Sequence, residues 1–193
     1  MIIKKIWQGI KDGYEGFINL VILKYRGVRR EENVKIHGII KIYGHGTIKI
    51  GKNTIINSSM DANPIGGDSR TIFSLKSDAE LSIGEDSGIS NTAIVCHSRV
   101  TIGSRVRIGG GTKIYDTDFH SLSFEERMDY ATETVNTKPV SIEDDAFVGA
   151  HCIILKGVRI GQRSIVGAGS VVTKEIPDDE VWAGNPARFI RRL

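Results

Sequence analysis

One histidine lies where its imidazole could do chemistry. His120 closely follows two acidic residues, Asp116 and Asp118. An imidazole titrates near neutral pH, so it can act as a general base. A nearby carboxylate can fix the tautomer of the imidazole and stabilise the imidazolium. It can equally bind a substrate hydroxyl or close a turn. Little or no chemistry is assigned to three other histidines, which lie in weak repeats or beside a corner: His37, His45 and His97.

The two cysteines are the other candidates for nucleophilic chemistry. Cys152 falls at an inward position of the repeat described below and is predicted to be a small core residue. Nothing in the sequence pairs Cys96 with a base in a known catalytic geometry. Two cysteines do not form a disulfide framework, so both thiols are expected to be dispensable.

A six-residue register must position these side chains. From Ile142, steps of six residues meet only β-branched aliphatic residues: Val148, Ile154, Ile160, Val166 and Val172. Two positions before each of them stands a small or β-branched residue. A short strand followed by a bend fits this spacing, whereas an α-helix does not. Three such faces close one triangular coil, and stacked coils bury the column as a parallel β-helix. The predicted fold class is therefore all-β.

Composition supports this interpretation. The chain has 193 residues, of which 29 are Ile, 14 Val, 7 Leu and 9 Ala. β-Branched residues favour strands, and 22 glycines favour many turns. An apolar fraction of 40% with 25% charged residues excludes a disordered chain, and no apolar run is long enough to span a membrane. With no recognisable signal peptide, we expect a cytoplasmic protein, and we expect no nucleic-acid partner.

The register fails at one place, which predicts a protruding loop. Ile114 and Ile142 are separated by 28 positions where one face needs six, so residues 115–139 leave the coil, with a short helix within Ser123–Tyr130. A second irregular segment covers Asn57–Arg70. We therefore expect a helical segment at 1–33, a β-helix at 34–182, and a tail or short helix at 183–193.

The first residues have the spacing of an amphipathic helix, or of two helices joined near Gly13. Residues 1–35 carry eight Lys or Arg against four Asp or Glu, net +4. Such a segment could touch anionic lipid at the inner face of the membrane through residues 1–30. It could also cap the open end of the β-helix, which solenoids require, and we favour the cap.

Four segments resemble the hexapeptide-repeat acyltransferase superfamily, and within it the maltose/galactoside O-acetyltransferase group, especially the sugar O-acetyltransferases of capsule and exopolysaccharide pathways. They are Ile114–His120, Val148–Ile153, Val166–Lys174 and Ala183–Arg188. The resemblance covers about residues 80–193 and implies a left-handed β-helix. It also implies transfer of an acetyl group from acetyl-CoA to a sugar hydroxyl in surface polysaccharide biosynthesis, by a homotrimer without a metal.

The resemblance also suggests individual roles. His120 matches the family's catalytic base, and Asp118 and Asn91 are candidates for binding the acceptor. Small residues let an extended pantetheine arm approach the backbone, and basic residues can meet phosphates. The candidate coenzyme-binding residues are Gly149, Ala150, Ala168, Thr173, Lys174 and Arg188.

Other functions stay open on the same scaffold. N-acetylation of an amino-sugar nucleotide and O-acetylation of serine are the nearest alternatives. A γ-type carbonic anhydrase needs three histidines on one zinc, and position 125, where a partner for His120 is needed, is Glu125. A β-helix without enzymatic activity, used as an assembly platform, is the remaining class.

Overall fold

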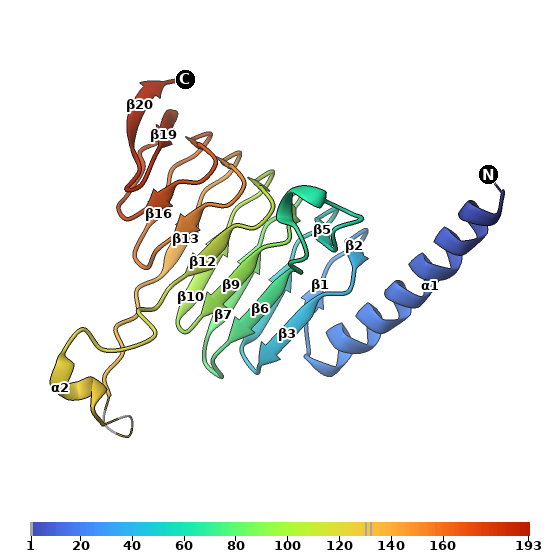
Figure 1. Cartoon of the computed structure of the whole chain (residues 1–193), viewed down its shortest axis with the longest axis horizontal. Helices are drawn as coiled ribbons and strands as arrows, with labels where there is room; N and C mark the ends of the chain where they lie inside the picture. Colours follow the sequence, from blue (N-terminus) through green and yellow to red (C-terminus); the bar gives the residue numbers. More distant parts are fainter. Residues whose placement is uncertain (1, 130, 132) are drawn as a thin grey trace.

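Three sheets, whose strands run parallel except for one at the C-terminus, wind into a three-sided prism (Figure 1). The computed structural model describes residues 2–129, 131 and 133–193, with side chains from residue 7 onward. Sheet A contains β1 (Arg29–Arg30), β4 (Thr47–Ile50), β7 (Glu80–Ile83), β10 (Arg99–Ile102), β13 (Val140–Ile142) and β16 (Arg159–Ile160). Sheet B contains β2 (Lys35–Gly38), β5 (Ile55–Ser58), β8 (Gly88–Ser90), β11 (Arg107–Ile108), β14 (Phe147–Val148), β17 (Ile165–Val166), β19 (Glu180–Ala183) and β20 (Arg188–Arg192). Sheet C contains β3 (Lys41–Gly44), β6 (Ile72–Leu75), β9 (Ala93–Cys96), β12 (Lys113–Tyr115), β15 (Ile153–Ile154) and β18 (Val171–Val172).

The six-residue register is the register of the coils. Ile142 pairs with Ile160, Val148 with Val166, and Ile154 with Val172, so equivalent residues of successive coils lie directly above one another. These side chains are fully buried. Because each coil buries its apolar column only against its neighbours, stacking supplies the core. The predicted parallel β-helix is confirmed.

The coils turn at three long edges, which we name by the sheets that they join. At the A–B edge, one residue of each coil has a positive φ, among them Asn53, Asp86 and Asp145. Asn and Asp tolerate this left-handed conformation better than other residues with side chains. Arg105 occupies the same position, and its guanidinium binds Asp145 of the next coil through two hydrogen bonds of 2.6 and 2.8 Å.

The N-terminal segment is one continuous helix, α1 (Ile2–Tyr25). Near its end, Leu23 joins the hydrophobic core, and the amide of Asn19 binds both Gly38 O and Ile40 N of the first coil. This half of α1 covers the first coil, as the cap requires. The β-helix begins at Arg29, earlier than the predicted boundary at residue 34.

The prediction of a C-terminal helix is wrong. Residues Arg188–Arg192 form β20, which pairs antiparallel with β19. All five of its side chains are exposed, so this segment has no apolar face that a helix could bury. Its backbone instead pairs with β19, whose outer edge would otherwise be unpaired.

The two irregular segments leave the prism at different edges. Residues 116–129, 131 and 133–139 leave the prism at the C–A edge and project away from the body, carrying the short helix α2 (Phe124–Arg127) (Figure 1). This confirms the predicted loop and its helix, although Tyr130, at the end of the predicted helical range, lies outside the described residues. Residues 59–71, with the 3-10 turn η1 (Pro64–Gly66), lie at the B–C edge. Among the described residues, no helix combines the length and apolar character needed to cross a membrane.

Candidate functional site

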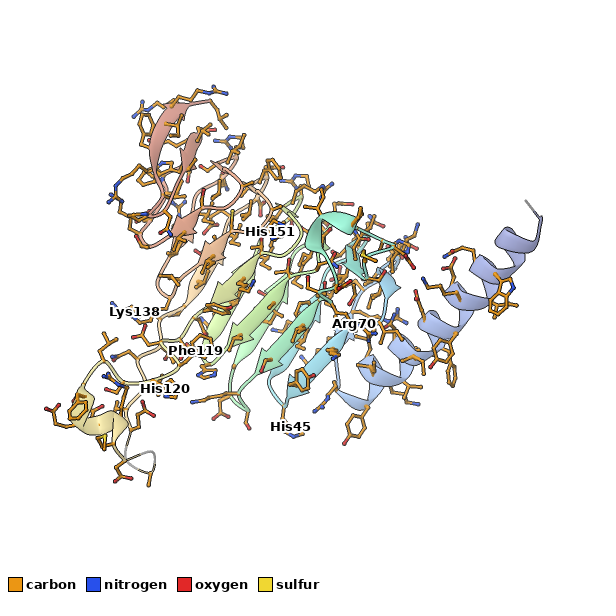
Figure 2. All side chains as sticks on the ribbon, viewed as in Figure 1. His45, Arg70, Phe119, His120, Lys138 and His151 are labelled. Carbon is orange, nitrogen blue, oxygen red and sulfur yellow. The ribbon has the colours of Figure 1, made fainter. Side chains whose placement is uncertain are left out.

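The base of the projecting loop is a short two-stranded ladder. Thr117 pairs with Thr137 in an isolated antiparallel bridge, and the Asp118 N–H donates to Asn136 O. The Lys138 N–H donates to Asp116 O. These backbone contacts join the two arms of the loop where it leaves the C–A edge. His120 lies just beyond this ladder (Figure 2).

Glu133 returns along the loop and meets the His120 ring. The two carboxylate oxygens lie 3.3 and 3.4 Å from His120 Nδ1, and one of them accepts a 2.6 Å hydrogen bond from the Ser121 N–H. The Glu133 side chain is only 7% exposed, whereas that of His120 is 60% exposed. The Ser121 N–H, aided by His120, lowers the pKa of Glu133, so this carboxylate is ionised at neutral pH.

This contact favours one tautomer of the imidazole. A carboxylate beside Nδ1 favours a proton on that nitrogen, which leaves the basic lone pair on Nε2. The arrangement is that of a general base with an orienting acid, and it faces solvent where an acceptor could enter. Sequence reasoning missed Glu133 because it considered only carboxylates beside His120 in the chain. The available signal was an acidic residue on the returning arm of the loop.

The two aspartates that flank His120 in the sequence have other partners. The buried Asp116 carboxylate accepts hydrogen bonds of 2.7 Å from both the His97 N–H and the Ser98 N–H. It therefore anchors the loop to the preceding coil. Asp118 lies 3.1 Å from the Lys156 ammonium of the following coil. The predicted contact of Asp118 with an acceptor stays a prediction.

Three aromatic rings contact one another near the base of the loop. Phe119 meets Tyr115 edge-on at 5.0 Å between ring centroids, and His97 at 6.3 Å. Phe119 has a φ of 66°, which turns the chain just before His120. Burial lowers the pKa of His97. These packing contacts help to fix the direction in which His120 leaves the prism.

Asn91 lies on another edge. It stands at the B–C edge with a φ of 45°, and its amide donates a 2.6 Å hydrogen bond to Ser69 O. Gly66 packs so closely on it that a Cβ there would collide with the Asn91 side chain. Asn91 thus pins the 59–71 segment, while its buried Oδ1 has no hydrogen-bond partner among the described residues. Asn91 and His120 of one chain lie across the width of sheet C from each other.

The predicted coenzyme residues divide between the same two edges. Gly149, Ala150 and Ala168 lie at the B–C edge, where a Cβ on Gly149 would collide with the backbone of Ala168. Arg188 lies at the same edge, because it pairs with Ala183 at the end of β19, and its side chain is exposed. A second group, the exposed Thr173 and Lys174, follows β18 at the C–A edge, where the loop of His120 also begins.

Lys174 closes the last coil. Its ammonium lies 5.2 Å from the centroid of the Trp182 ring, a cation–π contact. The Trp182 indole N–H donates to Glu180 at 2.7 Å. Lys174 therefore sits at the C-terminal end of the prism with its charge still exposed to solvent.

Both cysteines are buried and poorly suited to nucleophilic chemistry. Burial, aided by the charge of Asp116, raises the pKa of the Cys96 thiol to about 12. Burial also raises the pKa of Cys152, whose predicted place in the core is confirmed. Among the described residues, no three His, Cys, Asp or Glu side chains are grouped to hold a metal ion, which the zinc hydratase alternative would require.

Comparisons with known proteins agree with this geometry. Residues 139–174 match the family model "Hexapeptide repeat of succinyl-transferase". The galactoside O-acetyltransferase of Lactococcus lactis is 39% identical over 103 residues, which are 53% of this chain and 48% of that protein. The chain spans about half the length of the curated relatives it matches.

Two solved structures share most of the fold. A variant of AntD, an N-acyltransferase from Bacillus cereus in complex with dTDP and coenzyme A, has a TM-score of 0.70 and 28% identity, covering 88% of this chain and 86% of that chain. A hexapeptide-repeat acetyltransferase from Vibrio cholerae, in complex with acetyl-CoA, has a TM-score of 0.55 and 27% identity, covering 87% and 73%. The coils, their six-residue register and these similarities show a hexapeptide-repeat, left-handed parallel β-helix like that of the acyltransferases named above.

Proposed function

We propose that the protein transfers an acetyl group from acetyl-CoA to a sugar hydroxyl, with His120 as the general base. The observation that carries the proposal is the His120 imidazole held by Glu133 at the end of an anchored loop. Similarity to galactoside O-acetyltransferases supports a sugar hydroxyl as the acceptor. The acetyl-CoA complex of the Vibrio cholerae protein supports the donor.

The chemistry follows from the tautomer of His120. Nε2 takes the proton of the acceptor hydroxyl as its oxygen attacks the thioester carbonyl. The carbon–oxygen bond forms, and the carbonyl electrons move to an oxyanion. Collapse of this intermediate breaks the carbon–sulfur bond, and the imidazolium returns its proton to the leaving thiolate. The products are the acetyl ester and free coenzyme A, while Glu133 stabilises the transient positive charge on His120.

We propose that the complete site forms between copies of the chain in a homotrimer. The outer face of sheet C supports this, because most of the side chains around the exposed Lys113 on it are half-buried and apolar: Ile72, Ala93, Val95, Ile153, Leu155 and Val171. The outer face of sheet A instead carries ion pairs such as Lys49–Glu80. A cyclic trimer would bury the apolar face and bring the B–C edge of one copy, with Asn91 and Ala150, to the C–A edge of the next, with His120.

N-acylation of an amino-sugar nucleotide is the second candidate. The AntD structures, one of them solved with dTDP-4-amino-4,6-dideoxyglucose and coenzyme A, cover about 90% of this chain. The same base would then accept a proton from an amine rather than a hydroxyl. A role in surface polysaccharide biosynthesis inside the cytoplasm suits either acceptor and belongs to the proposal.

A thiol-release assay with acetyl-CoA tests the proposal. A panel of sugars is compared with nucleotide amino sugars, and the product bond, ester or amide, identifies the acceptor class. His120→Ala should lose about 100-fold or more in kcat while still binding coenzyme A. His45→Ala is the matched control, because His45 is exposed at the same C–A edge but several coils away (Figure 2). Full activity of His120→Ala would remove His120 from its role.

A further inference from the structure

The outer surface of α1 carries a continuous apolar stripe. Five residues separated by three or four positions lie on one helix face, and each is between 50% and 69% exposed: Trp7, Ile10, Tyr14, Phe17 and Val21. Tyr25 continues the stripe by one turn and is 79% exposed. Isolated apolar residues are normal on a protein surface, but a contiguous row along five turns of a helix marks a contact site.

The fold itself does not use this stripe. On the opposite side of α1, Glu15 accepts a 2.9 Å hydrogen bond from the Gly38 N–H, and Asn19 binds the same turn. Lys11 forms an ion pair with Asp61 of the 59–71 segment. Among the α1 side chains that the structure describes, from Trp7 to Tyr25, only Leu23 and the partly buried Ile22 pack on the core. The helix is therefore attached mainly by polar contacts, while its apolar face points away from the prism, the reverse of an ordinary surface helix.

Charge and residue type indicate what covers the stripe. Residues 1–35 carry a net charge of +4. The exposed Lys24 belongs to α1, and the exposed Arg29 and Arg30 form β1, which lies at the same end of the prism as α1 (Figure 1). Trp and Tyr are the residues that favour the boundary between lipid and water. A second copy of this end would bring the same positive charge and be repelled, whereas an anionic lipid surface attracts it.

We propose that α1 docks the protein on an anionic lipid surface. The helix lies in the plane of the headgroups, with Trp7, Ile10 and Phe17 inserted and the basic residues beside the lipid phosphates. The contact is peripheral and independent of the acetyl-transfer site. It would hold the prism with its first coil toward the lipid.

Trp7 provides a direct reporter, since Trp182 is the only other tryptophan. In a Trp182→Phe background, anionic phosphatidylglycerol-containing vesicles should shift Trp7 emission to shorter wavelength and sediment the protein. Pure phosphatidylcholine vesicles should do so at least about tenfold less, and added salt should weaken the binding. The paired change Ile10→Glu/Phe17→Glu should weaken binding about 100-fold.

Ile190→Glu is the matched control, because Ile190 is similarly exposed at the far end of the prism and should keep full vesicle binding. An unchanged unfolding midpoint of the paired variant shows that the fold is intact. The proposal is overturned if the native chain ignores anionic vesicles, if neutral vesicles bind equally well, or if Ile10→Glu/Phe17→Glu binds normally. It is also overturned if the paired change lowers only the oligomeric mass.

Discussion

Replacing Glu133 by Gln should lower turnover by about 10- to 100-fold. In a fully buried histidine–carboxylate pair, the amide substitution costs about 10⁴-fold because the ring adopts the wrong tautomer. Here the contact is 3.3 Å, longer than the roughly 2.7–2.9 Å of a strong charge-assisted hydrogen bond, and the histidine is 60% exposed. Water can therefore support part of the positive charge, and the expected loss is smaller.

The Gln side chain keeps the fold of the loop, which separates chemistry from structure. Its amide oxygen can still accept the hydrogen bond of the Ser121 N–H that now goes to the carboxylate. The effect should therefore appear in kcat, while the Kd for coenzyme A changes little. Glu125→Gln is the matched control, since Glu125 lies in α2 and its carboxylate binds the Ser123 hydroxyl instead.

A double variant makes the test sharper. If Glu133 acts through His120, adding Glu133→Gln to His120→Ala should cost little more, because the two residues work as one unit. Steady-state rates of the four proteins give this comparison directly. The reasoning is refuted if Glu133→Gln keeps full turnover, or if its loss is undiminished when His120 is absent.

Three further predictions follow from the burial and hydrogen bonds of the site. Cys96→Ala should keep at least about half of the activity, because burial raises the pKa of this thiol to about 12 and leaves almost no thiolate at neutral pH. Thiol-release rates of the variant measure this, and a loss of activity beyond tenfold would contradict it. Asp116→Ala should destabilise the fold by about 1–3 kcal/mol, because two backbone N–H groups lose their buried acceptor. Denaturant unfolding measures this loss, and an unchanged unfolding midpoint would contradict it. The pKa of Glu133 is lowered in the folded state, so the stability that its carboxylate adds is complete above the ordinary value near 4.3 and is lost as the pH falls through the lower folded value. The difference in unfolding midpoint between the native chain and Glu133→Ala should thus be constant from neutral pH to about pH 5 and shrink below about pH 4; a difference that first grows below pH 4 would contradict the sign.

The repeat and the loop could be predicted because both depend on local spacing. The series Ile142, Val148 and Ile154 needs only a strand and a bend every six residues, and the next coil repeats the same spacing. The same rule located the interruption after Ile114, where His120 leaves the prism. It also placed Cys152 in the core, where it is found.

The direction of α1 could not be predicted from its pattern. The spacing of Ile10, Phe17 and Val21 indicates an amphipathic helix, but periodicity does not say what the apolar face meets. The first coil offers backbone groups of Gly38 and Ile40, and these select the polar face with Asn19. The C-terminal strand was missed for a similar reason, because pairing with β19 depends on an open edge that exists only in the folded prism.

The sequence by itself determined the inward column, the corners and the point at which the chain leaves them, because those features depend on residues six positions apart or less. Only the tertiary structure decided which groups meet across the loop and around the prism. Glu133 reaches His120 because the loop folds back on its own ladder, and Asn91 stands a full sheet width from His120 because they occupy different edges. Such neighbours are set by long-range closure of the chain, whose geometry leaves no period in the sequence.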